Sequence, residues 1–303
     1  MTVLAPQRTP PDGPPARTAR RVAAAIGLGL LAALGGFAVY AAFVRTAFGQ
    51  KVDELAMQGA DVEHPRLESL LGSTLDGTSL LSVGVVALIA AGIGLVRRRV
   101  DLAVAAGVFI LGSNVTTQLL KALLTRPVLD SPTAHNSLPS GHTTAAASVA
   151  LALVLVLPHA VRALVTLAGA GYVAVIAVAT VWAGWHRPSD VVAALLVVLA
   201  WGAMTMAVVR ARRGGRVDAE RAPSRLAAVP LGALTMALPV LVLAVVGVAI
   251  LPGQVLSPGT MAFLAGSAGI GAAVAVVFLA WLSLVSGAGR AGRSDTGPTD
   301  TTH

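Results

Sequence analysis

The chain has 303 residues, of which 55% are hydrophobic and only 12% are charged, and its net charge is +8. A soluble globular protein carries about twice this proportion of charged residues, so a large soluble domain is excluded. The absence of cysteine excludes disulfides, thiolate metal sites and cysteine nucleophiles. The basic residues lie in short clusters between apolar runs, a pattern that argues against a nucleic-acid partner.

Apolar runs of about twenty residues recur along the chain, and each is long enough to cross a hydrocarbon core of about 30 Å as an α-helix. The runs predict an all-α polytopic membrane bundle of about eight spanning helices. The first run is too long for a cleaved signal peptide, so we expect a retained helix. The predicted spans cover residues 22–44, 79–96, 102–124, 142–158, 163–184, 189–209, 226–251 and 259–285.

These spans divide the chain into a six-span core, two additional spans and three polar segments. The core covers residues 22–209, and the additional spans lie within residues 226–285. The polar segments are poor in apolar residues, a composition typical of disordered tails and solvated loops. We expect disordered cytoplasmic tails at residues 1–21 and 286–303 and a basic cytoplasmic loop at residues 210–225.

A polar segment at residues 45–78 joins the first two spans and contains six acidic residues against three basic ones. Its acidic residues include Asp53, Glu54, Asp61 and Glu63, whose spacing matches no cation-binding loop. We therefore interpret the segment as a solvated polar loop.

The orientation of the spans follows from the basic residues, because short cytoplasmic loops accumulate Lys and Arg. With the N-terminus inside, sixteen of the twenty-two basic residues fall on the cytoplasmic side. An even number of spans returns the C-terminus to the same side. The sequence therefore predicts a multi-pass protein of the cell membrane with both termini in the cytoplasm.

Polar residues mark one face of the third predicted span. Asn114, Gln118, Lys121 and Thr125 are spaced by four, three and four residues, which places them on one side of a helix. Such residues normally face a protein interior or a watery cavity, although Lys121 alone is equally consistent with a side chain that snorkels to the interface. Arg126 follows directly, and a lysine with an arginine can neutralise a phosphate dianion.

The sequence Pro139-Ser140-Gly141-His142 precedes the fourth predicted span. Proline and serine are both typical of a helix start, and a helix N-terminus offers free amides to an anion. Gly141 allows the backbone to approach a phosphate closely. His142 can then donate a proton to a leaving alkoxide.

A second histidine, His186, precedes Asp190 by four residues at the start of the sixth predicted span. At this spacing the carboxylate can hold one ring nitrogen of the histidine and leave the other free to attack phosphorus. The alternative interpretation is that Asp190 caps a helix, while His186 has no catalytic role and lies among lipid head groups.

Together these residues resemble the type 2 phosphatidic acid phosphatase family, membrane relatives of the vanadium haloperoxidases. That family carries Lys…Arg-Pro, Pro-Ser-Gly-His and Ser-Arg…His…Asp motifs on a six-span helical core. The resemblance covers about residues 22–209, and the second motif is complete. His186 and Asp190 have the spacing of the third motif.

The resemblance implies a role for each motif residue. His186 would be the nucleophile that forms a phosphohistidine, Asp190 would orient it, and His142 would protonate the leaving group and later activate water. The expected phosphate-binding residues are Lys121, Arg126, Ser140 and Gly141. Members of the family need no metal, and the sequence shows no obvious metal cluster, so neither a metal nor a cofactor is expected.

The chain departs from the family pattern in two places. Four residues separate Lys121 from Arg126, where the family usually has six. Ala179-Thr180 stands where the family has Ser-Arg, so the second phosphate-binding arginine is missing. Arg187 is a candidate replacement, although its position on the helix points it in another direction. The lost arginine implies weaker phosphate binding, a different head group or a lost activity.

The sequence thus predicts a metal-independent hydrolase that acts on a lipid phosphate or a polyprenyl diphosphate at the extracytoplasmic face. The candidate substrates are phosphatidic acid, phosphatidylglycerol phosphate and a polyprenyl carrier diphosphate. Two non-hydrolytic alternatives remain open: a head-group or phosphoryl transferase, and a protein that binds or transports lipid phosphates. Transporters tend to show internal repeats with broken helices, and the sequence shows no such repeat.

Overall fold

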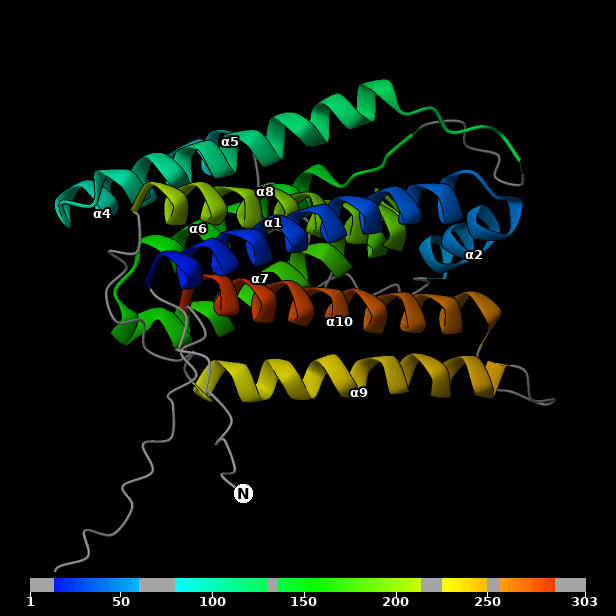
Figure 1. The fold of residues 1–303 in the computed structure, drawn as a ribbon. Helices are drawn as coiled ribbons and strands as arrows, with labels where there is room; N and C mark the ends of the chain where they lie inside the picture. The colour runs from blue at the N-terminus through cyan, green and yellow to red at the C-terminus, as the bar shows by residue number, and fades with distance from the viewer. Residues whose placement is uncertain (1–13, 60–79, 130–135, 214–224, 250–256, 287–303) are drawn as a thin grey trace, which may run out of the picture.

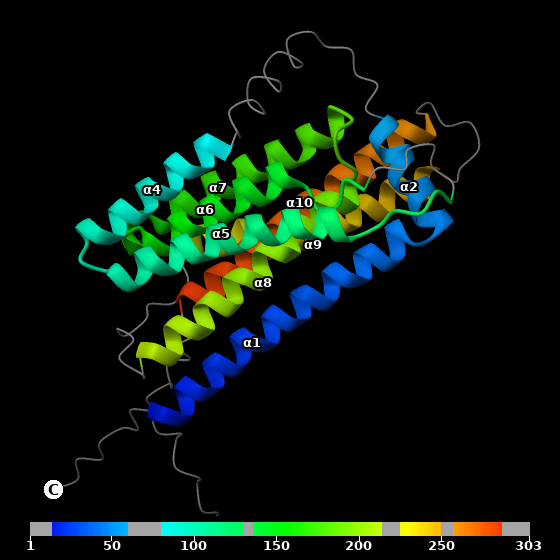
Figure 2. The same cartoon turned by 90° about the horizontal axis from the view of Figure 1, so that it is seen from above.

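The computed structural model describes residues 14–59, 80–129, 136–213, 225–249 and 257–286. Within these ranges the chain is helical and contains no strand, which confirms the prediction of an all-α bundle. The long helices lie side by side along one common direction, and the short helix α2 lies at one end of the bundle (Figures 1 and 2).

The helices follow one another through short turns or through segments outside the described ranges. The first helix, α1, continues without a break as the π-helix η1. The elements are α1 (Pro14–Val39), η1 (Tyr40–Val44), α2 (Ala47–Gln58), α4 (Leu80–Val96), α5 (Val100–Leu123), α6 (Gly141–Val156), α7 (His159–Trp182), α8 (Pro188–Arg213), α9 (Arg225–Ala249) and α10 (Pro258–Ser286).

Six of the described helices are long and apolar enough to cross a membrane: the α1–η1 helix, α5, α7, α8, α9 and α10. The other two predicted spans correspond to shorter apolar helices, Ala87–Val96 within α4 and Gly141–Val156. Helix α1 begins at Pro14, earlier than the expected start at Val22, because proline is well tolerated in the first turn of a helix. Residues 1–13 lie outside the described part of the chain.

Residues 47–58 form the helix α2, and the interpretation of this stretch as a solvated loop is wrong. The Thr46 hydroxyl caps the helix by accepting a hydrogen bond from the Gly49 amide at 3.0 Å. Gln50, Asp53 and Glu54 share one face of α2 and are buried, because they find polar partners within the bundle. The remaining acidic residues of the segment lie outside the described residues.

Two glycines allow α2 to lie directly on neighbouring backbone. A Cβ atom added at Gly49 would lie 2.0 Å from the carbonyl oxygen of Ala42, in α1–η1. A Cβ atom added at Gly59 would lie 1.8 Å from the carbonyl oxygen of Gly259, in the first turn of α10. Only glycine fits at such distances, so α2 is fixed between the end of the first span and the start of the last.

The C-terminal helix α10 belongs to the same hydrophobic core as the six-span region. The Trp281 ring stacks on Phe109 of α5, with 5.4 Å between ring centroids. Its indole N–H donates to the carbonyl oxygen of Leu151 in α6 at 3.0 Å. One residue of α10 therefore ties together two helices of the predicted core.

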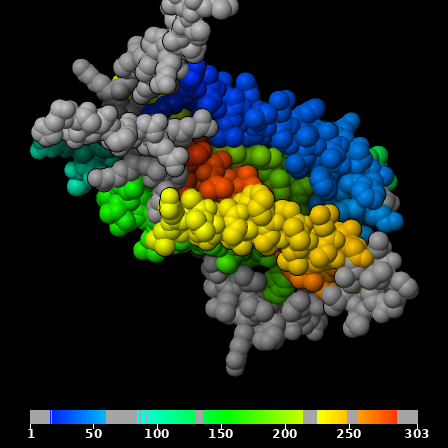
Figure 3. Space-filling model, turned by 60° about the horizontal axis from the view of Figure 1, so that its bottom comes forward, coloured from blue at the N-terminus to red at the C-terminus, as the bar shows by residue number. Residues whose placement is uncertain are grey.

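Helix α9 stands further out than α10. A cavity of about 490 Å³ separates it from the first span, with walls from α1, α2 and α9 and a floor from α8 and α10. Figure 3 shows this hollow between the blue first span and the yellow α9. Its lining is apolar except for Asp53 and Ser189, which bond to each other.

We predict that Trp281→Ala lowers the free energy of unfolding by about 3–5 kcal/mol, because it opens a cavity at the junction of three helices. Thermal unfolding of the purified protein in detergent measures the loss. Leu243→Ala, on the outer face of α9 where the side chain is 71% exposed, is the control and should change the midpoint little. Equal midpoints for the two variants would contradict the placement of α10 in the core.

Candidate active site

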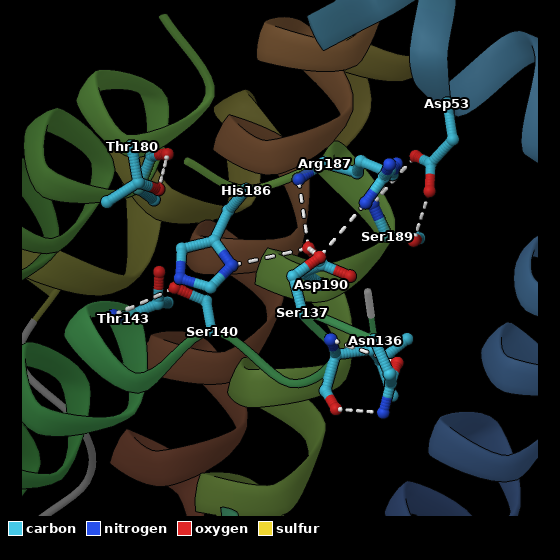
Figure 4. A network of polar contacts seen from close by, with 12 residues as sticks. Asp53, Asn136, Ser137, Ser140, Thr143, Thr180, His186, Arg187, Ser189 and Asp190 are labelled. Carbon is cyan, nitrogen blue, oxygen red and sulfur yellow. Dashed lines mark hydrogen bonds and ion pairs between the residues drawn. The ribbon is translucent and has the colours of Figure 1, made fainter. Parts of the chain in front are cut away.

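Four segments meet at the end of the bundle near α2: the last turn of α5, the loop that carries Arg126, the start of α6, and the link between α7 and α8. The α-helices alternate in direction, so the C-terminal ends of α5 and α7 meet the N-terminal ends of α6 and α8. The residues singled out in the sequence lie on these segments. Figure 4 shows the polar network they form.

Asp190 holds one side of the His186 ring. Its Oδ2 atom lies 3.2 Å from Nδ1 of His186 and also accepts hydrogen bonds from the Ser137 hydroxyl at 2.6 Å and the Arg187 amide at 3.0 Å (Figure 4). Both members of the pair are buried. Because the other polar atoms at this oxygen are donors, the network assigns the hydrogen to Nδ1 and leaves Nε2 with its lone pair.

The structure brings the second predicted histidine to the same place. The rings of His142 and His186 face each other edge to face, with 6.3 Å between their centroids. The Trp185 ring also lies near His142, with 5.5 Å between centroids. A histidine at the start of α6 and a histidine in the link between α7 and α8 thus lie close together, and of the two His186 is the one that contacts a carboxylate.

Ser140 joins the start of α6 to the start of α8. Its hydroxyl accepts a hydrogen bond from the Thr143 amide at 3.3 Å and so caps α6, and its own amide donates to the carbonyl oxygen of Asp190 at 2.9 Å. Helix geometry leaves the amides of Gly141 and His142 without an intrahelical acceptor. These amides give the start of α6 the character of an anion site.

Lys121 reaches this helix start despite its short separation from Arg126. A Cβ atom added at Gly141 would lie 3.7 Å from the Lys121 ammonium nitrogen. The polar face of α5 predicted from the sequence also turns towards α6, where Asn114 donates to the Ser148 hydroxyl at 3.2 Å. The ammonium group and the α6 amides therefore face the same space.

Arg126 is buried, with 6% of its surface exposed. Its three guanidinium nitrogens have no hydrogen-bond partner among the described residues. Burial and the neighbouring Arg187 lower the pKa of this group, while the carboxyl groups of Asp190, Asp53 and Glu54 act in the opposite direction. Buried polar atoms are normally paired, and an unpaired buried cation is strongly unfavourable, so an anion beside Arg126 would satisfy all three donors.

The backbone on both sides of Arg126 is held by residues that the sequence did not single out. The Tyr40 hydroxyl donates to the carbonyl oxygen of Thr125 at 3.1 Å. The Gln50 amide group donates to the carbonyl oxygen of Pro127 at 2.7 Å and accepts from the Leu129 amide at 3.4 Å. The three- and four-residue spacing of Gln50, Asp53 and Glu54 is consistent with one helix face but does not indicate what this face contacts.

Arg187 points towards α2. Its Nε and Nη2 atoms donate to Oε2 of Glu54 at 3.0 and 2.8 Å, and its Nη1 atom donates to the Ser137 hydroxyl at 3.0 Å. Thr180, at the place of the missing arginine, is buried and donates to the carbonyl oxygen of Ala177 in its own helix at 2.8 Å. Positions 180 and 187, the two candidates for a second phosphate-binding arginine, are thus both occupied by side chains that bond to other parts of the fold.

The described residues contain no group of three or more His, Asp or Glu side chains that could hold a metal ion.

His159 begins α7 at the opposite end of the bundle from the site.

A family model described as PAP2 superfamily matches residues 102–214, less than half of the chain. These residues, called the PAP2 region below, are similar to that superfamily. The region runs from α5 to the end of α8 and contains every predicted site residue, in agreement with the type 2 phosphatidic acid phosphatase resemblance. No curated protein and no solved structure matches the chain.

The PAP2 region leaves out α1, η1, α2, α4, α9 and α10. Gln50, which bonds to the backbone beside Arg126, and Glu54, which bonds to the Arg187 side chain, therefore lie outside it. The PAP2 superfamily supports a phosphatase-type membrane protein at a coarse level.

Asp53 is the second buried carboxyl group near the site. It accepts hydrogen bonds from the Ser189 amide at 3.1 Å and from the Ser189 hydroxyl. Its pKa is raised from 3.8 to about 7, first by burial and then by the nearby Asp190, while the Ser189 bonds and Arg126 act in the opposite direction.

We predict that this carboxyl group makes the protein less stable as the pH rises. A pKa raised in the folded state stabilises the fold fully below the unfolded-state pKa of 3.8, and this stabilisation is lost as the pH rises to about 7. Between pH 5 and pH 7 the loss is about 2 kcal/mol. Thermal unfolding in detergent at several pH values should show the fall in wild type and a flatter profile in Asp53→Asn, which resembles the protonated acid. Parallel profiles would contradict the prediction.

Proposed function

We propose that the protein is a membrane phosphatase that hydrolyses a lipid phosphate monoester or a polyprenyl diphosphate through a phosphohistidine on His186, at the face away from the cytoplasm. Two observations at the same end of the bundle carry this proposal: a histidine pair, and the buried guanidinium of Arg126, which has no hydrogen-bond partner among the described residues. One histidine of the pair is oriented by a buried carboxylate and the other is not, which suits a nucleophile and an acid.

In the first step the phosphoryl group lies against the Arg126 guanidinium, the Lys121 ammonium and the first amides of α6. Nε2 of His186 attacks phosphorus, the bond between phosphorus and the ester oxygen breaks, and its electron pair stays on the leaving oxygen. His142 donates a proton to that oxygen, so the lipid leaves as an alcohol, or as a monophosphate when the substrate is a diphosphate. The Asp190 carboxylate stabilises the positive charge that develops on His186.

In the second step a water molecule takes the place of the departed lipid. His142, now neutral, accepts a proton from the water while the oxygen attacks phosphorus. The bond between phosphorus and Nε2 breaks, inorganic phosphate is released, and His186 returns to its starting form. The 6.3 Å between the two rings is suited to groups that act on opposite sides of one phosphoryl group.

The surroundings of the site favour a lipid over a water-soluble ester. Exposed apolar side chains flank the phosphate-binding residues: Leu123 is 74% exposed, Val128 65% and Trp185 48%. Such residues are typical of the boundary between membrane and water, where tryptophan is enriched. The head group can then reach Arg126 while the hydrocarbon tail stays in the bilayer.

The proposal is tested by phosphate release from phosphatidic acid, phosphatidylglycerol phosphate and polyprenyl diphosphate, with a chelator present. We expect wild type to release phosphate from at least one of them, and His186→Ala to lower kcat at least about 1,000-fold because the nucleophile is lost. His159→Ala, the same substitution at the far end of the bundle, should keep wild-type activity.

No release from any of the three by wild type would contradict hydrolysis. Transfer of phosphate to an added alcohol would then indicate a transferase, and lipid binding without turnover would indicate a binding protein.

The orientation is proposed from the positions of the basic residues. Residues 97–99 and 210–213, rich in arginine, lie at the end of the bundle opposite the site, and such clusters favour the cytoplasmic side. In the proposed orientation both termini lie in the cytoplasm and the site lies outside.

Cysteine labelling tests the orientation cleanly, because the chain has no cysteine of its own. Val128→Cys, beside the site, should react with a membrane-impermeant maleimide in intact cells. Arg98→Cys should react only after permeabilisation. The reverse pattern would place the site in the cytoplasm.

A further inference from the structure

We propose that α2, a helix outside the PAP2 region, is a positioning element of the active site: Glu54 sets the geometry of the His186–Asp190 pair, and Gln50 sets the position of Arg126. The roles of these residues in turnover rest on the proposed function. The contacts that carry the inference do not depend on it.

The first contact path runs from Glu54 to His186 through three residues, Arg187, Ser137 and Asp190. Glu54 accepts two hydrogen bonds from Arg187, at 3.0 and 2.8 Å. Arg187 donates to the Ser137 hydroxyl at 3.0 Å, and this hydroxyl donates to Oδ2 of Asp190 at 2.6 Å. The same Asp190 oxygen faces Nδ1 of His186 (Figure 4).

Charge explains why this path needs a carboxylate at position 54. Arg187 is 4% exposed, and a buried guanidinium that loses its carboxylate partner turns to another acceptor or destabilises the fold. Asp190 already accepts a hydrogen bond from the Arg187 amide at 3.0 Å, so its carboxylate is the alternative acceptor for the Arg187 guanidinium. Glu54 therefore keeps the guanidinium away from the oxygen that orients the nucleophile.

The second contact path runs from Gln50 to Arg126. The Gln50 amide nitrogen donates to the carbonyl oxygens of Val44 and Pro127 at 2.8 and 2.7 Å. The guanidinium of Arg126 has no partner among the described residues, so the backbone on either side must hold it. Gln50 ties that backbone to η1 and fixes where the phosphate-binding cation stands.

A third contact attaches α2 to the start of α8. The Asp53 carboxyl group accepts from the Ser189 amide at 3.1 Å, one of the first amides of the helix that carries Asp190. Helix α10 supports both elements: a Cβ atom added at Gly266 would lie 2.9 Å from the Pro188 ring, the first residue of α8. The last span thus holds α2 and α8 together beneath the site.

Steady-state kinetics on three single variants of the full chain separate these paths. We expect Glu54→Ala to lower kcat about 10- to 100-fold with KM changed less than about threefold, because misplacement of a reacting group affects turnover. Gln50→Ala should raise KM about tenfold with kcat within about threefold. Lys51→Ala, on the exposed face of the same helix, is the matched control and should behave as wild type.

A double variant distinguishes positioning from a loss of folded helix. In Glu54→Ala/Arg187→Met no guanidinium remains to turn towards Asp190, so kcat should recover at least about fivefold over Glu54→Ala. If α2 had only a structural role, the second substitution would lower kcat further. The inference would be overturned if Glu54→Ala and Gln50→Ala changed kcat and KM to the same extent as each other. It would also be overturned if the double variant had a kcat no higher than that of Glu54→Ala.

Two measurements on the same variants need no turnover. Binding of inorganic phosphate, followed by calorimetry, should weaken about tenfold in Gln50→Ala and little in Glu54→Ala. Amide hydrogen exchange should rise at residues 136–140 in Glu54→Ala and at residues 125–129 in Gln50→Ala. If wild type hydrolyses none of the lipids, the proposed function fails, and these two measurements alone decide the role of α2: unchanged binding and exchange would overturn it.

Discussion

One carboxylate oxygen joins the parts of the site. Oδ2 of Asp190 accepts from Ser137 and the Arg187 amide and faces His186, while the carbonyl oxygen of the same residue accepts from Ser140. The loop before α6 and the link before α8 are thereby fixed to one residue. Because a hydrogen bond to a buried charge is stronger than one between neutral groups, this junction sets the distance between the two histidines.

Buried charge is the second constraint, because the site holds several ionisable groups within an apolar bundle. Glu54 pairs with Arg187, and Asp190 Oδ2 is held by Ser137, the Arg187 amide and His186, so these buried groups have partners inside the protein. Arg126 has no hydrogen-bond partner among the described residues. Under the proposed function the substrate would complete this site, since its phosphate would supply the charge that these residues do not.

Much of this arrangement could be read from the sequence, because the signals involved are local. Apolar runs of span length gave the helices, and the four-residue spacing of His186 and Asp190 gave their contact. The burial of α2 could not be read in the same way. Asp53 and Glu54 look solvated in a polar segment, and the groups that satisfy them, Ser189 and Arg187, lie more than 130 residues further along the chain.

The direction of Arg187 was hidden for the same reason, since only the fold reveals that Glu54 is beside it. The reach of Lys121 depended on how α5 meets α6, which a count of residues between Lys121 and Arg126 does not determine. Local patterns therefore specify which residues can do the chemistry, and long-range contacts specify where they stand.

The length of α6 has a consequence for how substrate arrives. Its 16 residues span about 24 Å, less than a hydrocarbon core of about 30 Å. Arg97 donates to the carbonyl oxygen of Val156 at its far end, and an arginine there marks the boundary of the bilayer. With α6 in a bilayer in the proposed orientation, the amide end at Gly141 would lie below the opposite surface, at the depth of lipid head groups. Encounters of a lipid substrate with such a site would be lateral, so the rate of supply would follow the mole fraction of substrate within the plane of the membrane and not its molarity in water.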